Sequence, residues 1–224
     1  MATLSEHLRS TLWAKTLDGA QLARIERDVV ERFCAAGTSV CRKGEPVDAW
    51  VGVLEGLVKI HTVSADGRPV TFTGVPSGGW LGEGSLLKTD PRKYDVLALR
   101  DSRIALMPRE TFLWLLDSSI GFNRFLLRQL NERLAQFIAL IEYERLLDTD
   151  ARIARSLGEL FNPILYPGIG PRLSISQEEI GYLAGVSRQR VNQALRRLEA
   201  QGLLKVEYGG VAVLDVDALR SYGA

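Results

Sequence analysis

The spacing of apolar residues along this 224-residue chain changes at about Arg109, and the change limits the folds open to it. Before that point short apolar runs alternate with Gly, Pro and Asp, a pattern that predicts the strands and turns of an antiparallel barrel or roll. The expected strands are Trp50–Leu54, Leu57–Ile60, Val70–Phe72, Val96–Leu99 and Ile104–Met107. Ahead of them, Leu4 to Arg32 has helical periodicity, so one or two helices should cover an end of the roll.

After Arg109 the apolar period is about 3.5 residues, which predicts a long helix from about Ile120 to Leu147 with a seam for a partner helix. The seam residues, at steps of three and four, are Leu127, Leu130, Leu134, Phe137 and Ile141. Off the seam, Phe122, Phe125, Leu126 and Ile138 are expected to pack back onto the roll. A helix that is apolar on two faces needs two partners, which favours a homodimer over the alternative of a single monomeric core.

Composition excludes several classes of protein. With 46% apolar and 25% charged residues the chain is globular rather than disordered, and its formal charge of +1 leaves an anionic partner to a local patch. Cys34 and Cys41 are the only cysteines and the N-terminal residues are polar, so we expect a cytoplasmic setting. No run approaches the roughly 18 apolar residues of a membrane span, and no membrane association is expected.

The segment Ser174–Leu198 predicts a helix-turn-helix. Ser176 and Glu179 have the spacing of a capping box, and Gly185 falls where the turn needs a left-handed backbone. Ser187 should cap the second helix, whose buried stripe would be Val191, Ala194, Leu195 and Leu198. Gln201–Leu214 then reads as strand, Gly-Gly turn and strand, which makes the motif a winged helix-turn-helix.

The opposite face of that second helix is rich in Arg, Gln and Asn, the side chains that read base edges in the major groove. From Arg172 to Lys205 there are six basic and three acidic residues, a local charge of +3. The expected DNA-binding residues are Ser176, Gln177, Ser187, Arg188, Gln189, Arg190, Asn192, Gln193 and Arg196. The alternative is a plain helical hairpin with a solvated Arg face.

The predicted fold class is therefore α+β, with an N-terminal antiparallel β-roll, a long dimerisation helix and a C-terminal winged helix-turn-helix. We expect three parts: a sensory roll with its N-terminal helices at 1–119, the dimerisation helix at 120–147, and the DNA-binding domain at 148–224. Asp148 or Asp150 should cap the first helix of the last part, from Ala151 to about Phe161.

With this order of parts the chain resembles the CRP/FNR family of bacterial transcription regulators over roughly Val29 to Leu214. The motifs that carry the resemblance are Arg42–Glu45, Val53–Lys59, Asp66-Gly67-Arg68, Gly79–Glu83, Ser176–Gly181 and Val186–Arg188. The resemblance implies a homodimer that binds a palindromic promoter under control of a small effector in the roll, with RNA polymerase as a further partner. It makes Arg188, Gln189 and Gln193 the base readers and places Ser187 on phosphate. A Glu is common where this chain has Gln189, so the preferred operator should differ.

The resemblance also suggests where an effector would bind. Members that bind cyclic AMP use a Gly-Glu pair and, about eleven residues later, an Arg-Ser pair. Gly82 and Glu83 match the first pair, but an ungapped count puts Lys93 and Tyr94 at the second, with Arg92 one residue away. The dimer helix keeps Arg133 but has Phe137 and Ile138 where such members have polar residues. The candidate effector residues are Gly82, Glu83, Arg92, Lys93, Tyr94 and Arg133, with capping or pairing within the roll as the alternative role of Glu83.

The effector is therefore left unidentified, and the absence of any effector is equally open. Cyclic AMP is disfavoured without being excluded. An iron–sulfur cluster on four thiolates is excluded within one subunit by the two cysteines, and no metal site is expected. His7 and His61 leave haem open, although a plain surface or strand role suits both better.

The leading hypothesis is thus a sequence-specific, double-stranded DNA-binding regulator and not an enzyme, since no nucleotide loop, metal cluster or nucleophile motif is visible. The alternative is a cyclic-nucleotide-responsive regulatory or adaptor protein that does not bind DNA.

Overall fold

The computed structural model describes residues 2–67 and 69–223, so Arg68 of the Asp66-Gly67-Arg68 motif lies outside the described residues. The chain begins with helix α1 (Leu4–Ser10), a 3-10 turn η1 (Ala14–Thr16) and helix α2 (Gly19–Asp28). The helical pattern predicted to reach Arg32 stops earlier, because Val30 already pairs with Leu106 in a sheet.

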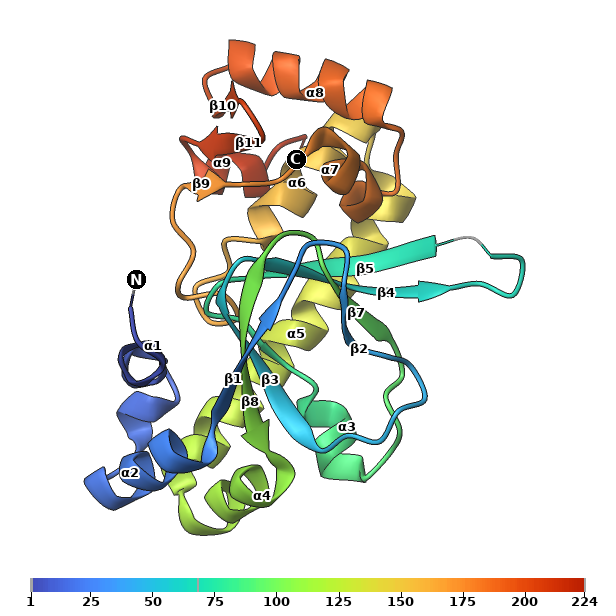
Figure 1. Ribbon diagram of the computed structural model, residues 1–224. Coiled ribbons are helices and arrows are strands. Elements are labelled where there is room, and N and C mark those ends of the chain that lie inside the picture. The colour runs from blue at the N-terminus through green and yellow to red at the C-terminus, as the bar shows by residue number, and fades with distance from the viewer. Residues whose placement is uncertain (1, 68, 224) are drawn as a thin grey trace.

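The roll consists of two four-stranded antiparallel sheets (Figure 1). One has the order β1-β8-β3-β6 and the other β2-β7-β4-β5. Their strands are β1 (Val30–Cys34), β2 (Ser39–Cys41), β3 (Ala49–Glu55), β4 (Leu57–Val63), β5 (Pro69–Pro76), β6 (Trp80–Leu81), β7 (Asp95–Ala98) and β8 (Ser102–Pro108). All five predicted apolar runs fall within or overlap these strands, which confirms the roll, whereas β1, β2 and β6 were not predicted.

Helices close the roll at one end and along one side. Helix α3 (Glu83–Lys88) follows β6, and helices α4 (Arg109–Ser118) and α5 (Ile120–Leu146) follow β8. An aromatic cluster joins these parts: the rings of Trp50 and Trp80 lie 4.4 Å apart, and Trp13 and Phe122 pack edge-on against them. Burial of such large side chains fixes α5 against the roll.

The C-terminal part consists of α6 (Thr149–Glu159), β9 (Arg172–Leu173), α7 (Gln177–Ala184), α8 (Arg188–Ala200), β10 (Leu204–Glu207), β11 (Gly210–Val213) and α9 (Val216–Arg220). The Asp148 carboxylate accepts from the Ala151 amide at 2.9 Å and caps α6, so of the two candidate caps, Asp148 and Asp150, it is Asp148 that forms the cap. The wing is present, with β9 added as a third strand in the order β10-β11-β9. Figure 1 places α8 at the end of the molecule opposite α2 and α4.

Candidate functional site

The geometry of the helix-turn-helix follows from a few local contacts. The Ser176 hydroxyl accepts from the Glu179 amide at 3.2 Å, and the Glu179 carboxylate accepts from the Ser176 amide at 2.6 Å, which completes the predicted capping box. Gly185 ends α7 with φ +64°. A Cβ at Gly181 would lie 2.7 Å from the Val186 carbonyl oxygen, so only glycine permits this close approach of the turn to α7.

Helix α8 buries the predicted stripe of Val191, Ala194, Leu195 and Leu198. The Ser187 hydroxyl accepts from the Arg190 amide at 3.4 Å and caps the helix. With one face fixed in the core, the other face must point outward. The exposed predicted residues are Ser176, Ser187, Arg188, Gln189, Arg190, Gln193 and Arg196. Gln177 and Asn192 are half-buried and bond to each other at 3.2 Å.

The charges on this face are unpaired. Across residues 2–67 and 69–223, Arg188, Arg190 and Arg196 form no ion pair with any acidic side chain. Arg197, on the side of the helix that turns back to α6, does pair with Asp150. The face that would meet an anion therefore keeps its positive charges available, which is the condition for attracting phosphate.

The wing extends the same surface. A groove of about 330 Å³ is lined by residues from both helices and the wing, among them Ser176, Gln177, Arg188 and Gly209. At the turn between β10 and β11, Tyr208 is fully exposed. The N-terminal ends of α7 and α8 and the wing tip thus lie together on one surface.

Helix α5 leaves an apolar stripe uncovered. Leu127, Leu134 and Ile141 are between 51% and 68% exposed, whereas Leu130 and Phe137 are half-buried. Phe122, Phe125 and Leu126 pack against the roll cluster as predicted. The prediction for Ile138 is wrong: it is 57% exposed, because it lies on the outward stripe one turn after Leu134.

The candidate effector residues lie where α3 meets α5. Gly82 has φ +98° and precedes α3, and a Cβ there would lie 3.3 Å from a terminal nitrogen of Arg92. Glu83 and Arg92 are both buried. Lys93 is the exception, because it is exposed and pairs with Asp90 at 3.3 Å. Arg92, rather than Lys93, is therefore the cation beside Gly82.

Glu83 is held by neighbours from two elements. Its carboxylate accepts from the Trp50 indole at 3.4 Å and lies 3.9 Å from Arg133 of α5. Burial, together with the Glu83 carboxylate nearby, raises the pKa of Tyr94 to about 12, so the Tyr94 phenol stays neutral at physiological pH. These contacts give Glu83 the pairing role within the roll that the sequence left open.

Arg133 connects this cluster to Trp80 and Tyr166, and through them to two glutamines of α5. It donates to the Trp80 carbonyl at 2.7 Å and to the Tyr166 hydroxyl at 3.1 Å. Tyr166 in turn donates to Gln136 at 3.2 Å, and Gln129 donates to the Trp80 carbonyl at 3.4 Å. Sequence reasoning missed Gln129, Gln136 and Tyr166. The signal for the two glutamines was available, since they flank Arg133 at steps of four and three and therefore share one face of α5 with it.

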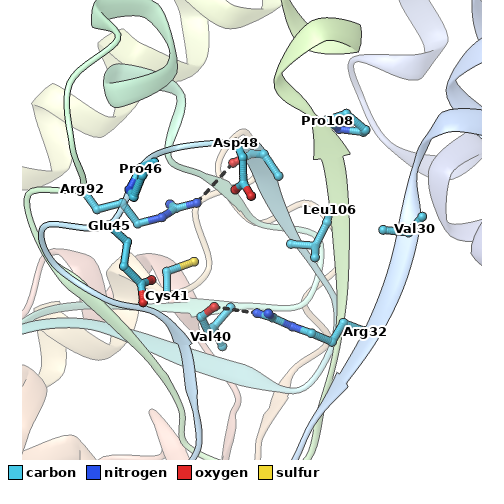
Figure 2. Close-up of a pocket in the computed structure, with 11 residues that line it drawn as sticks. Val30, Arg32, Val40, Cys41, Glu45, Pro46, Asp48, Arg92, Leu106 and Pro108 are labelled. Carbon is cyan, nitrogen blue, oxygen red and sulfur yellow. Dashed lines mark hydrogen bonds between the residues drawn. The ribbon is translucent and has the colours of Figure 1, made fainter.

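Arg92 also borders a cavity of about 640 Å³ whose lining includes residues of β1, β2 and β8. Figure 2 shows Arg92 and Arg32 on two sides of it, with Glu45 and Asp48 also in its lining. The two arginines donate to the carbonyls of Ala49 and Val40. Cys41 lines the same cavity, and burial raises the pKa of its thiol. The mixture of cations and carboxylates gives the cavity no net preference for an anion.

Two family models match this chain in order. A cyclic nucleotide-binding domain matches residues 31–119, and a Crp-like helix-turn-helix domain matches residues 151–222. The chain belongs to the CRP/FNR family of transcription regulators. Its cyclic nucleotide-binding domain covers the roll, and its helix-turn-helix domain covers the α6-to-α9 region, as the resemblance in the sequence indicated.

Relatives of known role agree. The chain is 28% identical over 193 residues to a CRP-like cAMP-activated global transcriptional regulator of Mycobacterium tuberculosis, with 82% of this chain and 83% of the relative covered. It is 27% identical over 206 residues to the CRP-like protein Clp of Xanthomonas campestris, with 88% and 89% covered. The name of the Mycobacterium relative thus makes it a transcription regulator, and the name of the Xanthomonas relative makes it CRP-like.

Solved structures share the fold. A CRP/FNR-family transcriptional regulator of Thermus thermophilus, 26% identical, superposes with a TM-score of 0.60 and covers 85% of this chain and 96% of its own. FixK2 of Bradyrhizobium japonicum is 18% identical with a TM-score of 0.72, covering 88% of this chain and 98% of its own, and shows the fold alone. Within the described residues, no helix has the length and apolar character of a bilayer span.

Proposed function

We propose that the chain acts as a homodimer that binds a palindromic promoter site, with one α8 helix in each of two successive major grooves and RNA polymerase as a further partner. In this proposal residues 1–119 form the sensory part, 120–147 the dimerisation helix, and 148–224 the DNA-binding domain. The observation that carries the proposal is the set of unpaired, exposed cations on α8, opposite its buried stripe.

The dimer is supported by the uncovered stripe of α5. Leu127, Leu134 and Ile141 expose large apolar side chains at steps of seven residues, which is the spacing of a two-helix seam. Pairing two copies through these stripes would bury both and would place the two α8 helices on one assembly. A palindromic site is the DNA counterpart of such two-fold symmetry.

The effector belongs to the same proposal. The Mycobacterium relative is named as cAMP-activated. The solved Clp of Xanthomonas campestris is described as c-di-GMP responsive; its structure is 25% identical with a TM-score of 0.61 and covers 88% of this chain and 99% of its own. In this chain Gly82, Glu83 and Arg92 fit a cyclic phosphate and ribose in residue type. However, Glu83 is already bonded to Trp50 and faces Arg133, which also donates to the Trp80 carbonyl and the Tyr166 hydroxyl. We therefore expect DNA binding without added cyclic nucleotide.

Fluorescence anisotropy of the full chain with a pool of duplexes, over a range of salt concentrations, tests the proposal. We expect affinity to fall steeply with salt, because each neutralised phosphate releases counterions. Arg188→Ala should lower affinity by about 1–3 kcal/mol and relax preference at one base pair. Glu199→Gln, an exposed substitution outside the predicted contact set, serves as a control. Absence of binding at low salt would favour the adaptor alternative.

A further inference from the structure

The loop at 162–171, between α6 and β9, places a tyrosine inside the roll. Tyr166 is fully buried and belongs to the cluster of apolar side chains between the two sheets, with Leu165 beside it. Its hydroxyl accepts from Arg133 and donates to Gln136, so a phenol's one donor and its acceptor site are both used. The chain thus buries a polar ring from outside the roll and satisfies it with side chains of α5.

The backbone on both sides is shaped for this loop. A Cβ at Gly79 would lie 2.9 Å from a ring carbon of Tyr166, and one at Gly78 would lie 2.6 Å from the Gly168 amide nitrogen. The loop itself is held by Asn162, whose side-chain oxygen accepts from the amides of Ile164 and Leu165 at 2.9 and 3.0 Å. Gly78 and Gly79, together with the turn that Asn162 orders, therefore make room for the Tyr166 ring.

The same loop connects α6 to the helix-turn-helix, which rests on the roll by other contacts. The Lys59 ammonium lies 4.7 Å from the centre of the Tyr182 ring. Arg100 pairs with Glu179 at 3.0 Å, and both side chains are largely buried. Helix α7 is thereby docked on β4 and on the segment between β7 and β8, while the face of α8 stays exposed.

We propose that the space inside the roll, at the side that faces α5, is a binding site for a para-substituted phenol ring, and that the chain fills it with its own Tyr166. This occupancy, together with the Lys59 and Arg100 contacts, holds α7 against the roll. Arg133 and Gln136 recognise the hydroxyl, and Gly79 makes room for the ring. The inference does not depend on DNA binding.

The test uses the full chain with Tyr166→Ala and 4-methylphenol as the probe, read by hydrogen exchange of loop 162–171 and of α7. We expect exchange of both segments to rise by on the order of 100-fold in the variant, as for a large buried side chain removed. Excess 4-methylphenol should slow the hydrogen exchange of both segments again in the variant and leave their exchange in the wild type unchanged. Toluene, which lacks the hydroxyl, should restore less of the protection from exchange.

Tyr166→Phe keeps the test decisive if the alanine variant does not fold. Loss of the hydroxyl alone should raise exchange of both segments by about 30-fold, the effect of removing two buried hydrogen bonds. Tyr143→Phe is the matched control, because it removes a tyrosine hydroxyl bond to Glu159 of α6, and it should leave α7 unchanged. Exchange of α7 that stays at the wild-type rate in Tyr166→Phe overturns the coupling. If toluene and 4-methylphenol restore the protection of Tyr166→Ala equally, the proposal that the site recognises a phenol is overturned.

Discussion

The Asn192 side chain of α8 donates a hydrogen bond to the Gln177 side chain of α7 at 3.2 Å, on the surface proposed to meet DNA. Gln177 is the first residue of α7 and Asn192 lies in the second turn of α8. The bond therefore joins the two helices of the motif at their DNA-facing side, and it uses side-chain groups that would otherwise be free for bases.

Asn192→Ala should accordingly weaken DNA binding by about 0.5–1.5 kcal/mol, the contribution of one hydrogen bond, and by the same amount on every duplex. Gln193→Ala, at the exposed neighbour, should cost about 1–3 kcal/mol and alter preference at one base pair. Anisotropy on the best duplex and its single-base variants measures both. A changed base preference in Asn192→Ala would show that Asn192 leaves Gln177 and reads a base itself.

Leu134→Glu should convert the chain from dimer to monomer, because it places a charge in the middle of the exposed α5 stripe, where a partner helix would bury it. Size-exclusion chromatography with light scattering measures the mass. Leu214→Glu, a matched change at a similarly exposed leucine outside α5, should leave the dimer intact. A dimer that persists in Leu134→Glu and dissociates in the control would move the interface away from α5.

Arg92→Ala and Lys93→Ala separate two neighbouring cations. Arg92 is only 6% exposed and donates to the Ala49 carbonyl, so its loss should lower the free energy of unfolding by about 1–3 kcal/mol. Lys93 is solvated, and its loss should change stability by less than about 0.5 kcal/mol. Urea unfolding measures both. Equal effects would contradict the placement of Arg92 beside Gly82.

The helix-turn-helix could be predicted from sequence because its determinants are local. Ser176 and Glu179 are three residues apart, and Gly185 and Gly181 act on the turn beside them. The roll strands with clear apolar runs were predicted for the same reason. Strand β1 was missed because Val30–Cys34 carries Glu31 and Arg32 and continues a helical pattern from α2, so only its pairing with β8 reveals it.

The roll interior could be predicted only in part because it is assembled from distant segments. Glu83 and Arg133 were expected there, but an ungapped count placed Lys93 where the structure has Arg92. The loop after α3 contains Thr89 with φ +59°, and the conformation of this loop, which decides whether Arg92 or Lys93 faces Gly82, does not follow from a residue count. Tyr166 gives no local signal, since a tyrosine in a Pro and Gly loop indicates neither burial nor a partner 33 residues earlier.

Glu159, at the end of α6, should make stability depend on pH. Burial raises the pKa of its carboxyl above the ordinary 4.5, although the Tyr143 hydroxyl, bonded at 3.0 Å, acts in the opposite direction. The folded state therefore binds this proton more tightly than the unfolded state. Its contribution to stability is fully present below pH 4.5 and is lost as pH rises through the raised folded value.

Glu159→Gln, which keeps an oxygen for Tyr143 and removes the buried charge, should therefore raise the free energy of unfolding at neutral pH. The gain should shrink towards pH 4.5, where the wild-type carboxyl is protonated in the folded protein. Urea unfolding across this pH range measures the difference, with Glu144→Gln, on an exposed turn of α5, as the control. A gain for Glu159→Gln that is the same at both ends of the range would mean that the substitution acts through packing and that the Glu159 charge is not the cause.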